Sequence, residues 1–80
     1  MKKFAVLKGV TKKRKAAELI AKAAFNIKQY RMRAGLTQEQ LEDRTRVTIS
    51  RCETGKYDIT LTTLSIISKA LKVEAYELLK

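Results

Sequence analysis

Apolar residues between positions 16 and 34 recur every three or four residues, which is the spacing of one face of an α-helix. The residues on this face are Ala16, Leu19 or Ile20, Ala23, Ile27, Tyr30 and Ala34. Lysines and arginines occupy many of the positions between them. Gly35 follows directly and can adopt the left-handed conformation that ends many helices. The pattern predicts a first helix over residues 16–34.

Residues 36–41 carry the signals of a helix N-terminus. Thr37 is followed three residues later by Gln40, and this pair can form a capping box in which each side chain bonds the backbone amide of the other. Leu36 precedes the cap, and Leu41 is placed to pack back against it. A short second helix is therefore expected to begin after Thr37.

Three more helices are expected in the C-terminal half. Ile49 and Cys52 share one face of a predicted helix over residues 46–54, which stops before Gly55. After a loop over residues 56–59, Thr60 caps a helix with an apolar stripe formed by Leu61, Leu64, Ile67, Ala70 and Leu71. A last helix over residues 74–79 contributes Tyr76, Leu78 and Leu79. The chain thus predicts an all-α fold of five helices with short connections and no room for a sheet.

The N-terminal residues do not share this periodicity. Residues 4–7, which are Phe, Ala, Val and Leu, could form a short strand that pairs with a partner or belong to a mobile arm. A basic run follows at Lys12, Lys13, Arg14 and Lys15. It could begin a helix, although cations at a helix N-terminus oppose the macrodipole. We therefore expect a basic arm over residues 1–15 and a domain over residues 16–80.

The net charge of +10 is concentrated in the N-terminal half. Eleven lysines and arginines stand against one acid before Leu36, whereas seven basic and seven acidic residues follow from there on. Such asymmetry favours a polyanionic partner, either a nucleic acid or an anionic membrane surface, although a basic tail can also serve solubility alone. No segment approaches the roughly 18 apolar residues of a membrane span, so a cytoplasmic protein is expected.

The residue inventory argues against catalysis and metal binding. The chain has one cysteine, Cys52, and no histidine, so neither an internal disulfide nor a structural zinc site is expected. It has no glycine-rich phosphate loop, and Glu42 and Asp43 are neighbours on one short helix, not a pair across a cleft. We expect no enzyme and no cofactor, and we interpret Cys52 as a small core residue.

Three segments together resemble the lambda-repressor-like, Cro-type helix-turn-helix family, also called the XRE family. Residues 27–41 are similar to its opening, residues 48–56 to the end of its recognition helix and the turn after it, and residues 60–79 to its last two helices. The resemblance covers about two-thirds of the chain. It implies a DNA-binding transcriptional regulator whose recognition helix, here at about residues 46–54, lies in the major groove.

The resemblance also implies roles for individual residues. Base contacts would come from Arg46, Val47, Ser50 and Arg51, since arginine can read guanine and a valine can pack on a thymine methyl. Contacts to the DNA backbone would come from Thr37, Gln38, Thr48 and Lys56. Arg31 and Glu53 match positions that form an internal ion pair in the family, so Arg31 is not counted among the DNA contacts.

The sequence departs from the family pattern between Leu41 and Thr48. It is three residues shorter there, and it lacks the glycine of the turn between the two helices. The second helix could lose a turn, with Thr45 as N-cap of the recognition helix. Alternatively Thr45 keeps a core position directly before Arg46 and the bend is lost, or three residues of the natural chain are absent from this sequence. Each alternative leads to a different geometry for DNA docking.

Two functions are weighed from these observations. The first is sequence-specific regulation of transcription by a homodimer that reads a palindromic site, with the basic N-terminal residues adding contacts to phosphates. The second is the antitoxin of a toxin–antitoxin pair, in which residues 1–10 bind the toxin. Membrane binding by a basic amphipathic helix over residues 12–33 leaves the pattern from Leu36 to Gly55 unexplained.

Overall fold

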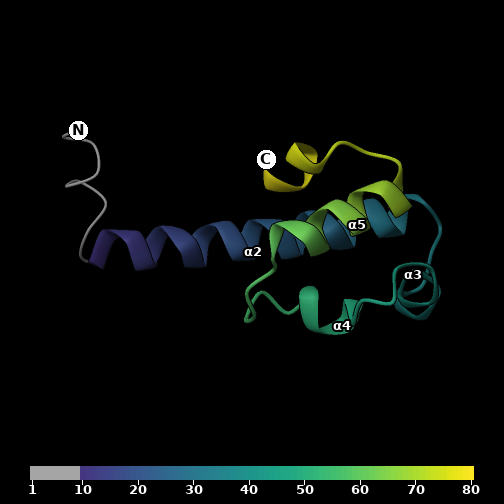
Figure 1. Cartoon of the computed structure of the whole chain (residues 1–80), viewed down its shortest axis with the longest axis horizontal. Helices are drawn as coiled ribbons and strands as arrows, with labels where there is room; N and C mark the ends of the chain where they lie inside the picture. The colour runs from purple at the N-terminus through teal and green to yellow at the C-terminus, as the bar shows by residue number, and fades with distance from the viewer. Residues whose placement is uncertain (1–9) are drawn as a thin grey trace.

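A computed structural model describes residues 10–80, and this part of the chain is helical with no strand (Figure 1). Its elements are α2 (Val10–Arg33), α3 (Gln38–Thr45), α4 (Ile49–Cys52), α5 (Leu61–Leu71) and the 3-10 helix η1 (Ala75–Leu79). The expected all-α class is confirmed. Four α-helices and one 3-10 helix stand in the described residues where five helices were predicted, and residues 1–9 lie outside the description.

Each element contributes one fully buried side chain to a single core. These side chains are Ile27, Leu41, Ile49, Ile67 and Leu78, in chain order from α2 to η1. Burying a side chain of this size contributes about 1.5–3 kcal/mol. The core therefore depends on all five elements at once, including the shortest of them.

The first helix begins at Val10, six residues earlier than the apolar pattern predicted. The basic run over residues 12–15 is part of this helix, and the expected boundary between arm and domain falls inside it. Lysine, arginine and alanine are strong helix formers, and no proline or glycine interrupts residues 10–33. Their helix propensity outweighs the unfavourable macrodipole term. The helix ends as predicted, because Gly35 takes a φ of 74°.

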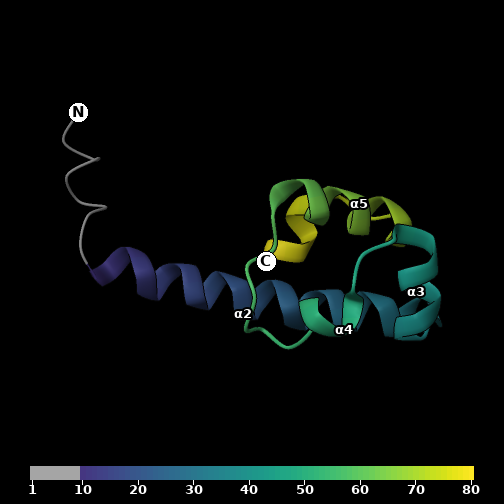
Figure 2. The same cartoon turned by 60° about the horizontal axis from the view of Figure 1, so that its bottom comes forward.

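The N-terminal half of α2 projects beyond the other elements, as both ribbon views show (Figures 1 and 2). Ala23, Ala24 and Ile27 are buried under the rest of the fold, whereas residues 16–19 are exposed. The apolar period is thus continuous along the helix, but the other elements cover only its second half.

Two hydrogen bonds attach η1 to α2. The side-chain amide of Asn26 donates to the carbonyl of Leu78 at 3.0 Å, and the Tyr30 hydroxyl donates to the Glu77 carboxylate at 3.2 Å. The side chain of Leu78 is fully buried. The C-terminal segment therefore closes the core on the side of α2, and the last helix predicted over residues 74–79 is a 3-10 helix over Ala75–Leu79.

Candidate nucleic-acid interface

Helix α3 has the predicted N-terminal cap and an unexpected C-terminal one. The Thr37 hydroxyl accepts from the amide of Gln40 at 3.0 Å, and the Gln40 side chain accepts from the amide of Thr37 at 2.9 Å. At the other end Arg46 takes the left-handed conformation, with φ 63°, and its amide donates to the carbonyl of Glu42 at 2.7 Å. Arg46 thus supplies the backbone conformation that glycine commonly provides at a helix end.

The bend between α3 and α4 is made without a glycine. Thr45 is buried as the last residue of α3, and its hydroxyl donates to the carbonyl of Leu41 at 2.8 Å and accepts from the amide of Val47 at 3.2 Å. Thr45 is therefore not the N-cap of the next helix, because that position belongs to Thr48. The core position of Thr45 matches the second alternative from the sequence, and the left-handed Arg46 provides the turn that this alternative lacked.

The predicted recognition helix over residues 46–54 is wrong in extent, because α4 comprises only Ile49–Cys52. Arg46 and Val47 belong to the turn before it, and Thr54 lies in the turn after it. Helix α3 thus extends to the buried Thr45, and α4 is about one turn long. Figure 1 shows the short α4 on the side of α2 that is opposite to η1.

The residues expected to contact bases are divided between two local structures. Ser50 and Arg51 are exposed on α4, on the side opposite the buried Ile49 and Cys52. Arg46 is exposed in the turn, whereas Val47 is half-buried and packs against the core. Ser50, Arg51 and Arg46 are therefore the three of this set whose side chains are exposed.

The N-terminus of α4 is held by a carboxylate from α3. Thr48 occupies the N-cap position but makes no side-chain capping bond. The amide of Ser50 instead donates to Glu42 at 3.2 Å. A carboxylate near a helix N-terminus is stabilising, because it meets amide groups that have no partner within the helix. Sequence reasoning missed this role of Glu42, since it depends on the angle between the two helices.

Arg51 stacks on an aromatic ring from the following loop. Its guanidinium carbon lies 4.8 Å from the centre of the Tyr57 ring, and that tyrosine is about half exposed. The interaction is a cation–π contact, which restricts the side chain without neutralising its charge. Tyr57 was not predicted as a site residue, and its place next to Arg51 arises only once Gly55 has turned the chain with φ 76°.

Arg31 and Glu53 form the internal ion pair that the family resemblance implied. The Arg31 Nε donates to one Glu53 oxygen at 2.6 Å and its Nη2 to the other at 3.1 Å, and both side chains are nearly buried. Arg31 Nη1 also donates to the carbonyl of Leu36 at 2.8 Å. The pair connects α2, the entry to α3 and the end of α4, and so fixes the exposed face of α4 against the rest of the fold.

Two of the four residues expected to contact the DNA backbone already form side-chain hydrogen bonds within the protein. Gln38 donates its side-chain amide to Glu53 at 2.8 Å, and Thr37 is engaged in the cap of α3. Thr48 and Lys56 are exposed, with no side-chain hydrogen bond to other described residues. Gln38 therefore completes the buried ion pair, a role that the resemblance did not imply.

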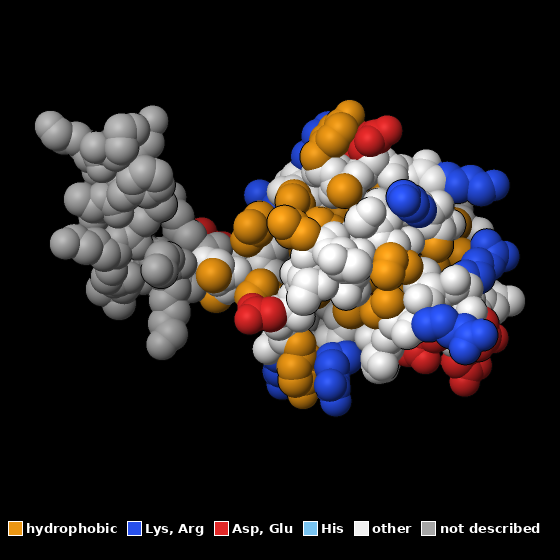
Figure 3. Space-filling view, viewed as in Figure 1, with side chains coloured by type: hydrophobic (Ala, Val, Ile, Leu, Met, Phe, Trp, Pro, Cys, Tyr) orange, Lys and Arg blue, Asp and Glu red, His pale blue; other side chains and the backbone are white. Residues whose placement is uncertain are grey.

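Charges of both signs lie around α3 and α4. The exposed cations of this region are Arg44, Arg46, Arg51 and Lys56, and the exposed acids are Glu39 and Asp43. Figure 3 shows acidic side chains gathered on the side of α3, next to basic ones. The side chains of the basic run over residues 12–15 lie outside the described part. The exposed cations of this region thus outnumber its exposed acids, although the sequence after Gly35 as a whole has no net charge.

Burial determines the chemistry of the one cysteine. Cys52 lies in the core on the inner face of α4. Desolvation raises the pKa of its thiol, and the nearby Glu53 and Glu42 raise it further. Within the described residues, no group of histidine, cysteine and acidic side chains is arranged to hold a metal ion. None of the helices in residues 10–80 combines the length and apolar character needed to cross a bilayer.

Most of the described part of the chain matches a known protein family. A helix-turn-helix family model matches residues 27–78, which include the C-terminal end of α2, all of α3, α4 and α5, and most of η1. No curated protein and no solved structure gives a significant match. Dimer formation, a palindromic site and a toxin partner stay predictions.

Proposed function

The chain belongs to the helix-turn-helix family of XRE-type DNA-binding transcriptional regulators, and we propose that it binds a specific double-stranded DNA site as a homodimer. The observation that carries this proposal is the placement of Ser50 and Arg51 on the exposed side of α4, with Arg46 in the turn before them. Ile49, Cys52 and the buried pair of Arg31 and Glu53 support these side chains from inside.

In this function Arg51 reads a guanine in the major groove. A guanidinium can donate to both acceptors of that base, and such a contact is worth about 1–3 kcal/mol. Its stacking on Tyr57 reduces the side-chain entropy that is lost on binding. Ser50 and Arg46 add contacts on either side, while the half-buried Val47 offers only part of its side chain. A one-turn helix presents few side chains, so base recognition is expected to cover few base pairs per half-site.

Electrostatic attraction comes from a different part of the chain. Residues 36–80 carry no net charge, whereas residues 1–35 carry the whole excess of +10. Lys12, Lys13, Arg14 and Lys15 on the projecting half of α2 would contact phosphates, together with Lys56, Thr48, Thr37 and Gln38 beside α3 and α4. Each phosphate neutralised steepens the salt dependence of the binding constant by about 0.9 in a double-logarithmic plot.

Selection of bound sequences from random double-stranded DNA tests the proposal. We expect an enriched two-fold-symmetric site, with half-sites about one helical turn apart. Arg51→Ala should then lower affinity for that site about tenfold or more and relax its sequence preference. The control is Lys69→Ala, which removes the same charge from an exposed position of α5. No enrichment, or equal losses for the two variants, would contradict the proposal.

A further inference from the structure

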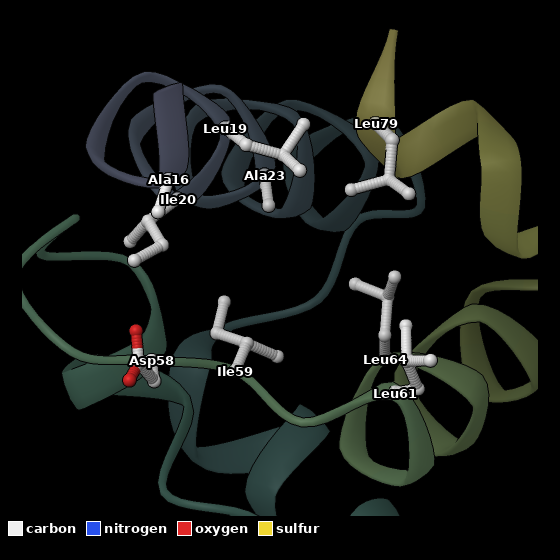
Figure 4. Close-up of a pocket in the computed structure, with 9 residues that line it drawn as sticks. All are labelled: Ala16, Leu19, Ile20, Ala23, Asp58, Ile59, Leu61, Leu64 and Leu79. Atoms are coloured by element: carbon white, nitrogen blue, oxygen red, sulfur yellow. The ribbon is translucent and has the colours of Figure 1, made fainter. Parts of the chain in front are cut away.

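An apolar groove lies where α2 emerges from the rest of the fold. Ala16, Leu19 and Ile20 of α2 form one side, with Leu79 of η1 next to them, and Ile59 and Leu61 lie opposite (Figure 4). Its volume is about 200 Å³. Figure 3 shows hydrophobic side chains gathered on the surface at this place. No residue of α4 lines the groove, and none of its lining residues is among the proposed DNA contacts.

The groove leaves large apolar side chains in solvent. Leu61 is 80% exposed and Leu19 is 48% exposed. Single exposed leucines are common, but a continuous apolar hollow of this kind usually marks a place where another segment or molecule binds. Asp58 is the charged residue of its lining, and no ion pair of Asp58 occurs among the described side chains. A suitable occupant would therefore be apolar and would carry a cation.

The chain contains such a segment immediately before α2. Phe4, Ala5, Val6 and Leu7 form a continuous apolar run, with Lys2 and Lys3 before it and Lys8 after it. No other stretch of the first fifteen residues has four apolar residues in succession. Composition and charge thus match the lining of the groove.

The reach of this segment also matches the groove. With a rise of about 1.5 Å per residue, Ala16 and Ala23 lie about 9 and 20 Å along α2 from Val10. An extended chain advances about 3.3 Å per residue, so residues 7 and 4 lie about 10 and 20 Å from Val10. If the chain reverses direction just before α2, residues 4–7 run alongside residues 16–23. Gly9 stands at that point and tolerates the positive φ that a sharp reversal requires.

We propose that residues 4–7 of this chain fold back along α2 and occupy the groove, with Lys8 beside Asp58. The docked run covers Leu19 and Leu61 and extends the core to the first half of α2. In this arrangement α2 is packed along residues 16–33, and the apolar run is not an arm that is available to another protein. The proposal is independent of the DNA-binding function, since it uses neither α4 nor the turn before it.

Direct contacts in the full-length chain test this arrangement. Nuclear Overhauser effects should connect the methyl groups of Val6 and Leu7 with those of Leu19 and Leu61 in dilute solution. Mixing isotopically labelled with unlabelled chains separates contacts within one chain from contacts between chains. Contacts that occur only between chains would overturn the proposal and assign the groove to a second copy. Absence of any contact would overturn it as well.

A double-mutant cycle gives an independent measure. Leu61→Ala should lower the urea midpoint of unfolding, although Leu61 is 80% exposed to solvent in the described part of the chain. Leu7→Ala should have less than half its wild-type effect in the Leu61→Ala background. Met32→Ala is the control, because Met32 is 56% exposed and does not line the groove. Additive effects of Leu7→Ala and Leu61→Ala, or a loss with Met32→Ala as large as with Leu61→Ala, would contradict the proposal.

Discussion

Helices α3 and α4 are neighbours in the helix-turn-helix, but they are stabilised in different ways. Helix α3 has eight residues, a complete capping box at Thr37 and a left-handed cap at Arg46. Helix α4 has four residues and no side-chain bond from its own N-cap, Thr48. A single turn fixes several backbone angles for very few hydrogen bonds and is unstable by itself. The helix that carries the proposed DNA contacts Ser50 and Arg51 is therefore the one that depends on the rest of the fold.

Tertiary contacts hold α4 on every side that faces the protein. Ile49 and Cys52 enter the core, Glu53 pairs with Arg31 of α2, and Glu42 of α3 accepts from the amide of Ser50. Only the outer side, with Ser50 and Arg51, is left exposed. A helix of one turn can therefore be held in place without local helix signals, provided that side chains from other elements bind its ends.

Among the substitutions that test how α4 is held, Glu53→Ala should have the largest effect on stability, because it removes the ion pair with Arg31 of α2. It leaves Arg31 nearly buried without its carboxylate and also removes the acceptor of Gln38, so we expect a loss of about 3–5 kcal/mol in the free energy of unfolding. Urea denaturation measures the loss. Lys80→Ala, which breaks the exposed pair with Glu77, should cost less than about 1 kcal/mol.

If the substitution leaves the fold intact under native conditions, α4 should be the element that opens. Hydrogen exchange should accelerate at the backbone amides of residues 52 and 53, which in the unsubstituted chain donate to the carbonyls of Thr48 and Ile49. Exchange within α3 should change less. Equal acceleration in the two helices would show that α4 has no special dependence on the ion pair.

The two N-caps provide the next test. Thr37→Ala removes the hydroxyl that accepts from the amide of Gln40 in the capping box. It should lower the free energy of unfolding by about 1 kcal/mol. Thr48→Ala removes a side chain that makes no capping bond, and its effect should lie within about 0.5 kcal/mol of zero. Both are threonine-to-alanine changes at exposed positions, so urea midpoints compare them directly. A cost at Thr48 as large as at Thr37 would contradict the comparison.

Arg46→Gly should act in opposite directions on stability and binding. Glycine relieves the left-handed conformation, which costs other residues about 1–2 kcal/mol, and loses part of that gain through chain entropy. We expect a net gain of about 0.5 kcal/mol in unfolding free energy and weaker DNA binding. Lys72→Gly is the matched control, because Lys72 has φ 62° at the end of α5. It should give the same gain without loss of binding.

The smallest effect concerns pH. Since burial raises the pKa of the Cys52 thiol, the unfolded chain loses this proton at lower pH than the folded chain does. Cys52 therefore contributes no pH dependence at neutral pH and lowers stability as pH rises above the thiol's ordinary range. Unfolding free energies at several pH values between 7 and 10 should fall more steeply for wild type than for Cys52→Ala. Parallel curves would exclude this contribution.

The sequence predicted the elements that carry their own local signals. Thr37 and Gln40, Gly35 and Thr60 specify helix ends through neighbouring residues, and the structure has these ends where they were expected. The predicted apolar stripe of α5 is buried at Leu64, Ile67 and Leu71, whereas its first residue, Leu61, is exposed. The match of residues 27–78 to the helix-turn-helix family agrees with the same signals. In these places local propensity and tertiary packing favour the same conformation.

The tertiary structure determined the features that depend on residues far apart in the chain. The sequence without a glycine at the turn left the bend unresolved, and in the structure the left-handed Arg46 makes this bend directly after the buried Thr45. Glu42 at the start of α4, Gln38 on Glu53 and Tyr57 under Arg51 likewise follow from the packing of separate elements. By itself, the sequence determined which side chains are available for recognition, because composition and helical period are local properties. Only the fold decided which of them are engaged inside the protein and which face a partner, because that depends on distances between segments that the sequence separates.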